Sequence, residues 1–312
     1  MNVFEAIFQG IIQGLTEFLP VSSSGHLTIT QHILGMSEDN LFFSVMLHIG
    51  TLAAVIAVYV RLVGRLFKAL VRVCKKIFTK KFKLKELDGE ENLAFMIIIG
   101  LLPLFVMFLP IGNGMKLKDL ADVFAKDGYF IVVGLSLLAT SALLYIGNRQ
   151  SQKYGDGKQD GKKKARRRYK IPDALIVGGT QCLAALFPGL SRSGSTLAAS
   201  QLRGMDKKIA LDYSFLLGTP AIVAAALLEG KDALFPANGQ AVTIEYFPVI
   251  IGMLFAGVVG FIAIKLFKWL LSTDKMYIFI IYTAIVGAIV LVISIIELAT
   301  GENMFTHNTL VF

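Results

Sequence analysis

The sequence has 312 residues, of which 55% are hydrophobic and 17% are charged, and its mean hydropathy is +0.66. This composition is that of a polytopic membrane protein and excludes an ordinary water-soluble domain. The formal net charge of +9 does not indicate a nucleic-acid partner, because the basic residues gather in the segments between apolar stretches.

Residues 3–36 are apolar but do not form one uninterrupted stretch. Four polar side chains recur at every fourth position, so a helix here carries one polar stripe. These residues are Glu5, Gln9, Gln13 and Glu17. Pro20 and the run from Ser22 to Gly25 then interrupt the pattern, and a second apolar piece begins at His26. Two half-helices that meet at such a break predict a re-entrant hairpin.

Six further stretches are long enough, or nearly so, to cross the apolar core of a bilayer, which is about 30 Å thick. They lie near residues 41–60, 93–111, 128–147, 209–228, 246–264 and 276–296. Lys and Arg are concentrated in residues 61–91, 149–170 and 265–275, which predicts that these three segments are cytoplasmic. The sequence therefore predicts six membrane spans.

Residues 173–205 have the same form as residues 3–36. The segment from Gln13 to Pro20 aligns with Gln181 to Pro188, and Ser22 to Gly25 aligns with Ser191 to Gly194 after a shift of one residue. This is an internal repeat with a period of about 170 residues. It divides the chain into a first repeat of residues 1–148, a basic cytoplasmic linker of residues 149–172 and a second repeat of residues 173–312. Each repeat holds one hairpin and three spans, and the odd number of spans predicts that the two repeats are inverted.

The break in the second hairpin places an arginine in a turn rich in hydroxyl groups. Arg192 follows an uncharged run from Ala174 to Ser191 and precedes an apolar helical stretch whose start the hydroxyl groups can cap. Helix-start amides and a planar cation together suit a phosphate or another oxyanion. A capped helix start with an arginine that reaches the membrane surface is the structural alternative.

Inverted repeats place their helix breaks near the middle of the membrane, where the breaks face each other. The sequence therefore predicts one polar cavity lined by Gln13, Glu17, Ser22, Ser23, Ser24, His26, Ser191, Arg192, Ser193, Ser195 and Thr196. Glu17 and Arg192 should both face it, because an unpaired charge in lipid is costly. A purely structural ion pair between them explains neither His26 nor the hydroxyl groups.

This set of side chains matches the requirements of phosphoryl transfer. Arg192 can stabilise charge on phosphate oxygens, a serine or His26 can attack phosphorus, and Glu17 can orient or deprotonate the nucleophile. Gln13 lies one helical turn from Glu17 and can offer its amide to phosphate or metal. With one carboxylate in the set, a divalent cation (Mg²⁺ or Ca²⁺) is expected only where Glu17 and substrate phosphates hold it together.

The remaining polar residues receive other assignments. His32, His48 and His307 are expected to be structural or interfacial, and Trp269 to anchor an interface. Asp212, inside the fourth span, is a further candidate for lining the cavity. The two cysteines, Cys74 and Cys182, predict neither a disulfide nor a metal site, and no secretory signal peptide is expected at the start.

Two motifs resemble those of the undecaprenyl-diphosphatase family, the bacitracin-resistance type of bacterial membrane phosphatase. Gln-x-x-x-Glu followed by Phe-Leu-Pro-Val-Ser-Ser-Ser-Gly-His spans Gln13 to His26, and Pro-Gly-Leu-Ser-Arg-Ser-Gly-Ser-Thr spans Pro188 to Thr196. The resemblance covers nearly the whole chain. It implies an all-α polytopic enzyme of the bacterial inner membrane that hydrolyses undecaprenyl diphosphate to undecaprenyl phosphate and inorganic phosphate. This reaction recycles the lipid carrier for cell-wall synthesis and is linked to bacitracin resistance.

The same resemblance implies roles for individual residues. It assigns catalysis to Glu17, Ser23, His26 and Arg192, and substrate binding to Gln13, Ser22, Ser24, Ser191, Ser193 and Thr196. It also implies a site that opens toward the outer face of the membrane and is helped by a divalent cation at Glu17. It does not decide whether Ser23 or His26 is the nucleophile. The basic stretch of residues 153–170 looks longer than the family requires, and a homodimer is left open.

The alternative from another class is a secondary transporter or a lipid flippase. Inverted repeats with broken helices are the architecture of many transporters, and such a protein needs no nucleophile. A purely structural membrane protein leaves the paired motifs unexplained.

Overall fold

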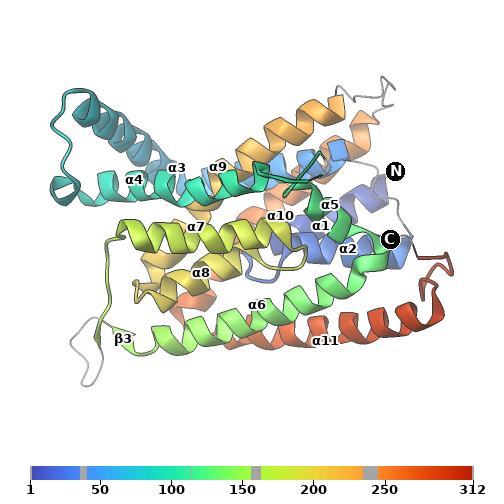
Figure 1. The fold of residues 1–312 in the computed structure, drawn as a ribbon. Helices are drawn as coiled ribbons and strands as arrows, with labels where there is room; N and C mark the ends of the chain where they lie inside the picture. The colour runs from blue at the N-terminus through green and yellow to red at the C-terminus, as the bar shows by residue number, and fades with distance from the viewer. Residues whose placement is uncertain (1, 36–40, 113, 156–162, 235–244, 311–312) are drawn as a thin grey trace.

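The computed structural model describes residues 2–35, 41–112, 114–155, 163–234 and 245–310, and its architecture is all-α (Figure 1). Within these residues, six helices are long and apolar enough to cross a membrane. They are Phe42–Phe78, Gly89–Phe108, Phe130–Ser151, Lys207–Leu228, Tyr246–Ser272 and Tyr277–Thr300. The structure thus confirms the predicted all-α polytopic membrane fold. The β-structure described is two short strand pairs, β1 (Pro110–Gly112) with β2 (Met115–Lys116) and β3 (Tyr154–Gly155) with β4 (Lys163–Lys164).

Each predicted hairpin consists of two short helices separated by a break. The first hairpin is α1 (Val3–Phe18) and α2 (Ser23–Leu34), and the second is α7 (Ile171–Leu186) and α8 (Arg192–Leu202). The Asn2 side chain caps α1 in a capping box with Glu5, and α2 ends where Gly35 adopts the left-handed conformation, with φ 61°. These helices are too short to cross a bilayer alone.

The long helices mostly extend beyond the predicted spans. The helix α3 (Leu41–Phe78) continues well past residue 60, because basic side chains that cannot lie in the bilayer core are still good helix formers. The second span begins as α4 (Gly89–Leu101) and ends as the 3₁₀ helix η2 (Leu102–Phe108), where Pro103 lacks a backbone donor. The other elements are η1 (Leu84–Glu86), α5 (Asp119–Ala125), η3 (Asp127–Tyr129), α6 (Phe130–Ser151), α9 (Lys207–Leu234), α10 (Tyr246–Ser272) and α11 (Tyr277–Thr300).

The order of elements is the same in both halves of the chain: a hairpin is followed by three long helices. The packing partners correspond as well, since α1 packs on α10 and α7 packs on α4 and η2. The helix α3 packs on α9, and α6 packs on α11. In Figure 1 the first hairpin lies toward the end of the molecule that carries both termini, and the second toward the end that carries β3. The inverted orientation of the halves in the membrane stays a prediction, as do the repeat boundaries. The end of the first hairpin at residue 36 and residues 156–162 of the linker lie outside the described residues.

Glycines allow the hairpins to approach the long helices closely. A Cβ atom at Gly10 of α1 would lie 2.4 Å from the carbonyl oxygen of Gly252 of α10. A Cβ atom at Gly178 of α7 would lie 2.1 Å from the carbonyl oxygen of Gly100 of α4. Association of helices in lipid depends on such close packing of backbones. Each hairpin is therefore fixed against the other half of the chain.

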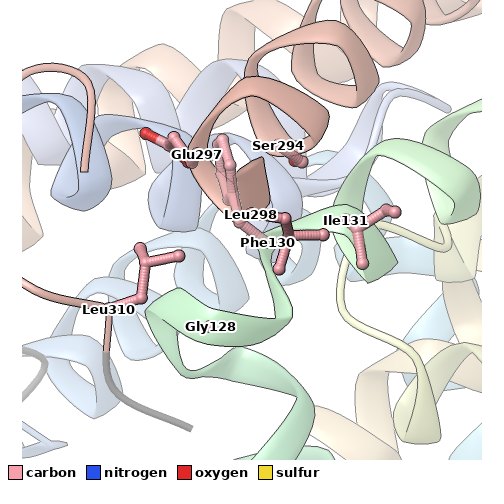
Figure 2. Close-up of a pocket in the computed structure, with 7 residues that line it drawn as sticks. All are labelled: Gly128, Phe130, Ile131, Ser294, Glu297, Leu298 and Leu310. Carbon is pink, nitrogen blue, oxygen red and sulfur yellow. The ribbon is translucent and has the colours of Figure 1, made fainter. Parts of the chain in front are cut away.

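Buried ionic groups tie the outer ends of the hairpins. In the second hairpin, the buried Asp173 carboxylate accepts hydrogen bonds from Arg166 and, at 2.8 Å, from Arg203. In the first, the imidazole of buried His32 lies 2.8 Å from the Glu297 carboxylate of α11. Beside this pair is a shallow pocket (Figure 2), lined by Gly128, Phe130, Ile131, Ser294, Glu297, Leu298 and Leu310. His32 has a structural role in this arrangement.

Candidate active site

The breaks of the two hairpins meet inside the protein. A Cβ atom at Gly25 would lie 2.9 Å from the Cα atom of Gly189, so the two turns are in backbone contact. The Ser193 hydroxyl donates to the Leu19 carbonyl oxygen at 3.0 Å, which joins the turns by a hydrogen bond. Residues separated by more than 160 positions in the sequence therefore form one site.

Each break is also the start of a helix. Ser22 caps α2 and Ser191 caps α8, and their hydroxyl groups accept from the amides of Gly25 at 3.2 Å and Gly194 at 3.1 Å. Ser22 adopts a φ of 74°, an unfavourable left-handed backbone conformation for a residue with a side chain. The first amides of both helices lack intrahelical acceptors, and the helix dipoles favour an anion there. The two breaks together therefore bring the starts of α2 and α8 to the same site, where both favour an anionic ligand.

The Glu17 carboxylate is at the centre of the site. It is 5% exposed, at the end of α1. Its Oε1 accepts from Nη2 of Arg192 at 2.5 Å, and its Oε2 accepts from the Ser23 hydroxyl at 2.7 Å and from Nε2 of Gln13 at 3.0 Å. Glu17 and Arg192, which the sequence places at one site, are in direct contact, and a serine hydroxyl is held on the same carboxylate.

The position of Arg192 depends on a glycine in α9. A Cβ atom at Gly218 would lie 1.6 Å from Nη1 of Arg192, so the guanidinium occupies the space that any side chain at position 218 would fill. The Arg192 side chain is 22% exposed, so it is not fully enclosed by the protein. Its Nη2 bonds Glu17, which leaves further donors of the guanidinium for a ligand.

His48, which the sequence reading placed outside the site, lies beside Glu17. Its Nε2 is 3.8 Å from Oε2 of Glu17, and its Nδ1 lies 2.8 Å from the Ser44 carbonyl oxygen. The repeat gave no signal for this residue, because its alignment sets Gly50 and not His48 against Gly218.

His26 lies on the same break but has different partners. Its Nδ1 is 2.7 Å from the Ser22 carbonyl oxygen, which requires Nδ1 to be the donor, so the Tyr282 hydroxyl at 2.7 Å donates to Nε2 in the neutral ring. The two rings are stacked with centroids 5.6 Å apart. Tyr282 comes from α11, and nothing in the apolar sequence of that helix distinguishes it.

Most hydroxyl groups of the second break hold the turn in place. The Thr196 hydroxyl lies 2.6 Å from that of Ser214, and the Ser191 hydroxyl caps α8. The Ser193 hydroxyl is directed to the first hairpin, as described above. In the first break, the exposed Ser24 lies with its hydroxyl 3.2 Å from that of Ser22. The assignment of these residues to substrate binding stays a prediction.

Asp212 belongs to another polar group. Its Oδ1 accepts from the Tyr59 hydroxyl at 2.8 Å, and Nζ of Lys268 lies over the Tyr59 ring, 3.8 Å from its centroid. Tyr59 is the residue at which α3 departs from helical geometry. The contacts of Asp212 are therefore with this kink and not with Glu17 or Arg192.

The described residues hold no group of three or more His, Cys, Asp or Glu side chains that could bind a metal ion. Glu17 can still supply a hard oxygen ligand, and Gln13 adds another. Its Oε1 is buried and has no hydrogen-bond partner, while its Nε2 bonds Glu17. A buried acceptor without a donor next to a carboxylate is chemically suited to a Mg²⁺ or Ca²⁺ ion that substrate oxygens also bind.

Comparisons with known proteins show which proteins this chain is similar to. The model of the family described as bacitracin resistance protein BacA matches residues 6–289. An undecaprenyl-diphosphatase of Alkaliphilus metalliredigens is 37% identical over 297 residues, which cover 95% of this chain and 100% of that protein. An undecaprenyl-diphosphatase of Halothermothrix orenii is 36% identical, with 94% and 99% covered. Undecaprenyl-diphosphatase 4 of Bacillus thuringiensis is also 36% identical, with 93% and 97% covered.

Proposed function

Because the chain belongs to the bacitracin resistance protein BacA family, we propose that it hydrolyses undecaprenyl diphosphate to undecaprenyl phosphate and inorganic phosphate at the site of Glu17 and Arg192. One observation carries the assignment of the site: a single buried carboxylate binds both a serine hydroxyl and a guanidinium, on two hairpins that meet in the protein. Hydrolysis of the diphosphate regenerates the monophosphate carrier for cell-wall polymers, which agrees with the bacitracin resistance named for the family.

In the first step, the Ser23 oxygen attacks the terminal phosphorus. The hydroxyl proton passes to Oε2 of Glu17, 2.7 Å away, as the Oγ–P bond forms. The bond between the terminal phosphorus and the bridging oxygen breaks, and undecaprenyl phosphate leaves with the electron pair of that bond. Glu17 thus acts as the general base and Ser23 as the nucleophile.

Arg192 stabilises the charge that develops during this step. Its guanidinium donors that do not bond Glu17 face the phosphate oxygens, and the first amides of α2 and α8 add further donors. A positive group and two helix starts in a water-poor cavity strengthen these interactions. Glu17 first gives the proton taken from Ser23 to the departing phosphate. Its carboxylate then takes a proton from a water molecule whose oxygen attacks the phosphoserine, the bond between phosphorus and Oγ breaks, and the proton passes from Glu17 to the Ser23 oxygen as inorganic phosphate leaves.

His26 is the second candidate for the nucleophile. Its ring nitrogens are both engaged, one with Ser22 and one with Tyr282, so an attack by His26 requires the Tyr282 hydroxyl to leave Nε2. Ser23 needs no such rearrangement, which is why the geometry favours it. The two are separated by trapping the intermediate, since phosphohistidine is labile in acid and phosphoserine is not.

The residues of the site suit a divalent cation that would assist the reaction. Glu17 and Oε1 of Gln13 would hold it together with the diphosphate oxygens. When bound, it would neutralise part of the charge on the diphosphate.

The charge distribution supports a topology with the basic segments of residues 61–91, 149–170 and 265–275 in the cytoplasm. We place the protein in the bacterial inner membrane, with the site open to the outer face, because the resemblance to the family implies both. A homodimer is the assembly we propose, and its mass in detergent, measured by light scattering, tests it.

The first experiment measures phosphate release from undecaprenyl diphosphate by the purified protein in detergent, with and without a chelator. Ser23→Ala, Glu17→Gln and Arg192→Ala should each reduce kcat/KM about 100-fold or more, because general-base catalysis and charge stabilisation are each worth at least that much. Ser272→Ala, which removes a hydroxyl bonded within its own helix, is the matched control and should be near normal.

Near-normal release by folded Glu17→Gln or Arg192→Ala would refute the site. Absence of release by the folded native chain, with transport of the lipid in sealed vesicles, would instead support the transporter alternative.

A further inference from the structure

The helix α3 is longer than a membrane crossing requires, and residues 61–78 form its distal part. The 38 residues of α3 give a helix about 57 Å long, against a bilayer core of about 30 Å. The helix departs from regular geometry at Tyr59, two residues before Arg61. Figure 1 shows the part beyond this point running away from the other helices, at the end of the molecule where α4 begins.

The basic residues of this segment form two groups. One group pairs with acidic side chains at the start of α4: Arg65 with Glu90 at 2.7 Å, Arg72 with Glu91 at 3.2 Å, and Lys76 with Glu91 at 2.6 Å. The other group, Arg61, Lys68 and Lys75, is exposed and makes no ion pair with any of the described residues. Its members are seven residues apart, so they form one row along the helix. This row has no acidic partner within the described protein.

An exposed apolar row runs beside the free basic row. Phe67, Val71 and Phe78 are 68%, 55% and 87% exposed, and Cys74 is exposed between them. The spacing of i, i+4, i+7 and i+11 places all four on one helix face. Lys68 and Lys75 each follow a member of this row, so they lie about 100° around the helix from it. An apolar row of this kind is unstable in water, and its flanking charge is uniformly positive.

We propose that this basic–apolar face, formed by Arg61, Phe67, Lys68, Val71, Cys74, Lys75 and Phe78, binds the anionic headgroup layer of the cytoplasmic membrane surface. The apolar row enters the boundary between headgroups and acyl chains, and the basic row binds lipid phosphates. A neutral occupant would explain the apolar row and not the unpaired basic row. The proposal goes beyond the phosphatase function, because none of these residues contacts Glu17 or Arg192.

The experiment uses the native Cys74 as a reporter in the full-length protein. Cys182→Ser leaves one thiol, which is labelled with an environment-sensitive fluorophore, and the protein is placed in nanodiscs of phosphatidylcholine with or without phosphatidylglycerol. In anionic discs the emission should shift to the blue, and nitroxide-labelled lipids should quench it while aqueous iodide does not. The triple variant Arg61→Gln, Lys68→Gln, Lys75→Gln should lose this dependence on phosphatidylglycerol.

A matched control removes the same charge elsewhere. Lys153→Gln, Lys163→Gln, Lys164→Gln alters the linker and should keep the response of the native chain. Equal quenching by iodide in both kinds of disc would overturn the proposal, as would equal loss in the two triple variants. Protection from both iodide and lipid quenchers would also overturn it, because the face would then be covered by protein. Phosphate release in detergent confirms that each variant is folded.

Discussion

At Gly218 the absence of a side chain leaves the space in which the guanidinium of the proposed site lies. The Arg192 side chain starts on α8, reaches the Glu17 carboxylate of α1, and passes through the space that a Cβ atom on α9 would occupy. Charge stabilisation of a phosphate depends on the location of the cation to within a fraction of an ångström. We therefore expect the activity to depend on the position of the guanidinium as well as on its charge.

Gly218→Ala tests this dependence. The new Cβ would displace the guanidinium, so we expect kcat/KM to fall at least about 10-fold while the thermal unfolding temperature changes little, since the end of a flexible side chain can move aside. Gly230→Ala on the same helix is the control, because its Cβ would meet only Val45 at 3.7 Å. Equal activity of the two variants would contradict the assignment.

Tyr282→Phe tests the contact between Tyr282 and His26, which no motif predicts. With Ser23 as the nucleophile, His26 acts as an oriented polar group at the break. Removing the hydroxyl that fixes its ring, without changing the ring packing, should therefore lower kcat several-fold with KM nearly unchanged. The same substitution made in His26→Ala should have no further effect, because the pair acts as a unit. Tyr277→Phe, an exposed tyrosine on the same helix, serves as the control. Additive losses in the double variant would show that Tyr282 acts through another group.

Different interactions hold the hairpins and the long helix α3 in place. The helices that begin at the site are α2 and α8. The hairpins are fixed by glycine contacts and by serine caps inside the protein. The distal part of α3 is instead held to α4 by ion pairs at its exposed end. This end of the molecule should therefore respond to pH.

Asp88 is the residue at which we expect the stability of this end to depend on pH. It caps α4, and its pKa is lowered because its carboxylate accepts from the Glu91 amide at 2.7 Å, with Arg72 close by. A lowered pKa in the folded state means that the stabilisation is present above the ordinary pKa of an aspartate and is lost as the pH falls through the lowered value. We expect Asp88→Ala to destabilise the start of α4 by about 1 kcal/mol at neutral pH.

Hydrogen exchange of the first amides of α4 measures this effect. Exchange should speed up in the native protein as the pH is lowered through the folded-state pKa of Asp88, after correction for intrinsic rates, and should be fast at all pH values in Asp88→Ala. An unchanged protection pattern in the variant would show that packing alone holds this helix start.

For the whole molecule, stability and activity rest on different polar groups. The site lies where the hairpin breaks meet, whereas the buried His32–Glu297 and Asp173 groups join the far ends of the hairpins to the rest of the chain. The His32 ring is also stacked on Phe130, with centroids 3.9 Å apart. These groups should therefore hold the halves together without taking part in the chemistry.

Glu297→Ala tests whether this residue contributes to stability and not to activity. Loss of the carboxylate removes the acceptor of the Met304 amide and one of the partners of the His32 ring in a buried position, and leaving a buried polar group unsatisfied costs about 1–3 kcal/mol. We expect a clear fall in the thermal unfolding temperature in detergent, with kcat unchanged at a temperature where the variant is folded. Glu302→Ala, an exposed acidic residue nearby in sequence, should leave both unchanged. A fall in kcat without a loss of stability would place Glu297 in the chemistry.

The sequence by itself determined the spans, the two hairpin breaks and the charged pair Glu17–Arg192. These follow from local physics: an apolar stretch must match the bilayer thickness, Pro, Ser and Gly interrupt helices, and charges in lipid need partners. The repeat and the two motifs then indicated the chemistry.

The tertiary structure decided the contacts between distant residues. It placed His48 beside Glu17, Tyr282 on His26 and Asp212 on Tyr59. It directed the Ser193 hydroxyl to Leu19 of the first hairpin and the Thr196 hydroxyl to Ser214 of α9. Each of these contacts joins different helices, and Tyr282 lies 256 residues from His26. Such contacts depend on how closely the helix backbones approach and at what rotation, which glycine packing across the whole bundle sets and no local pattern encodes.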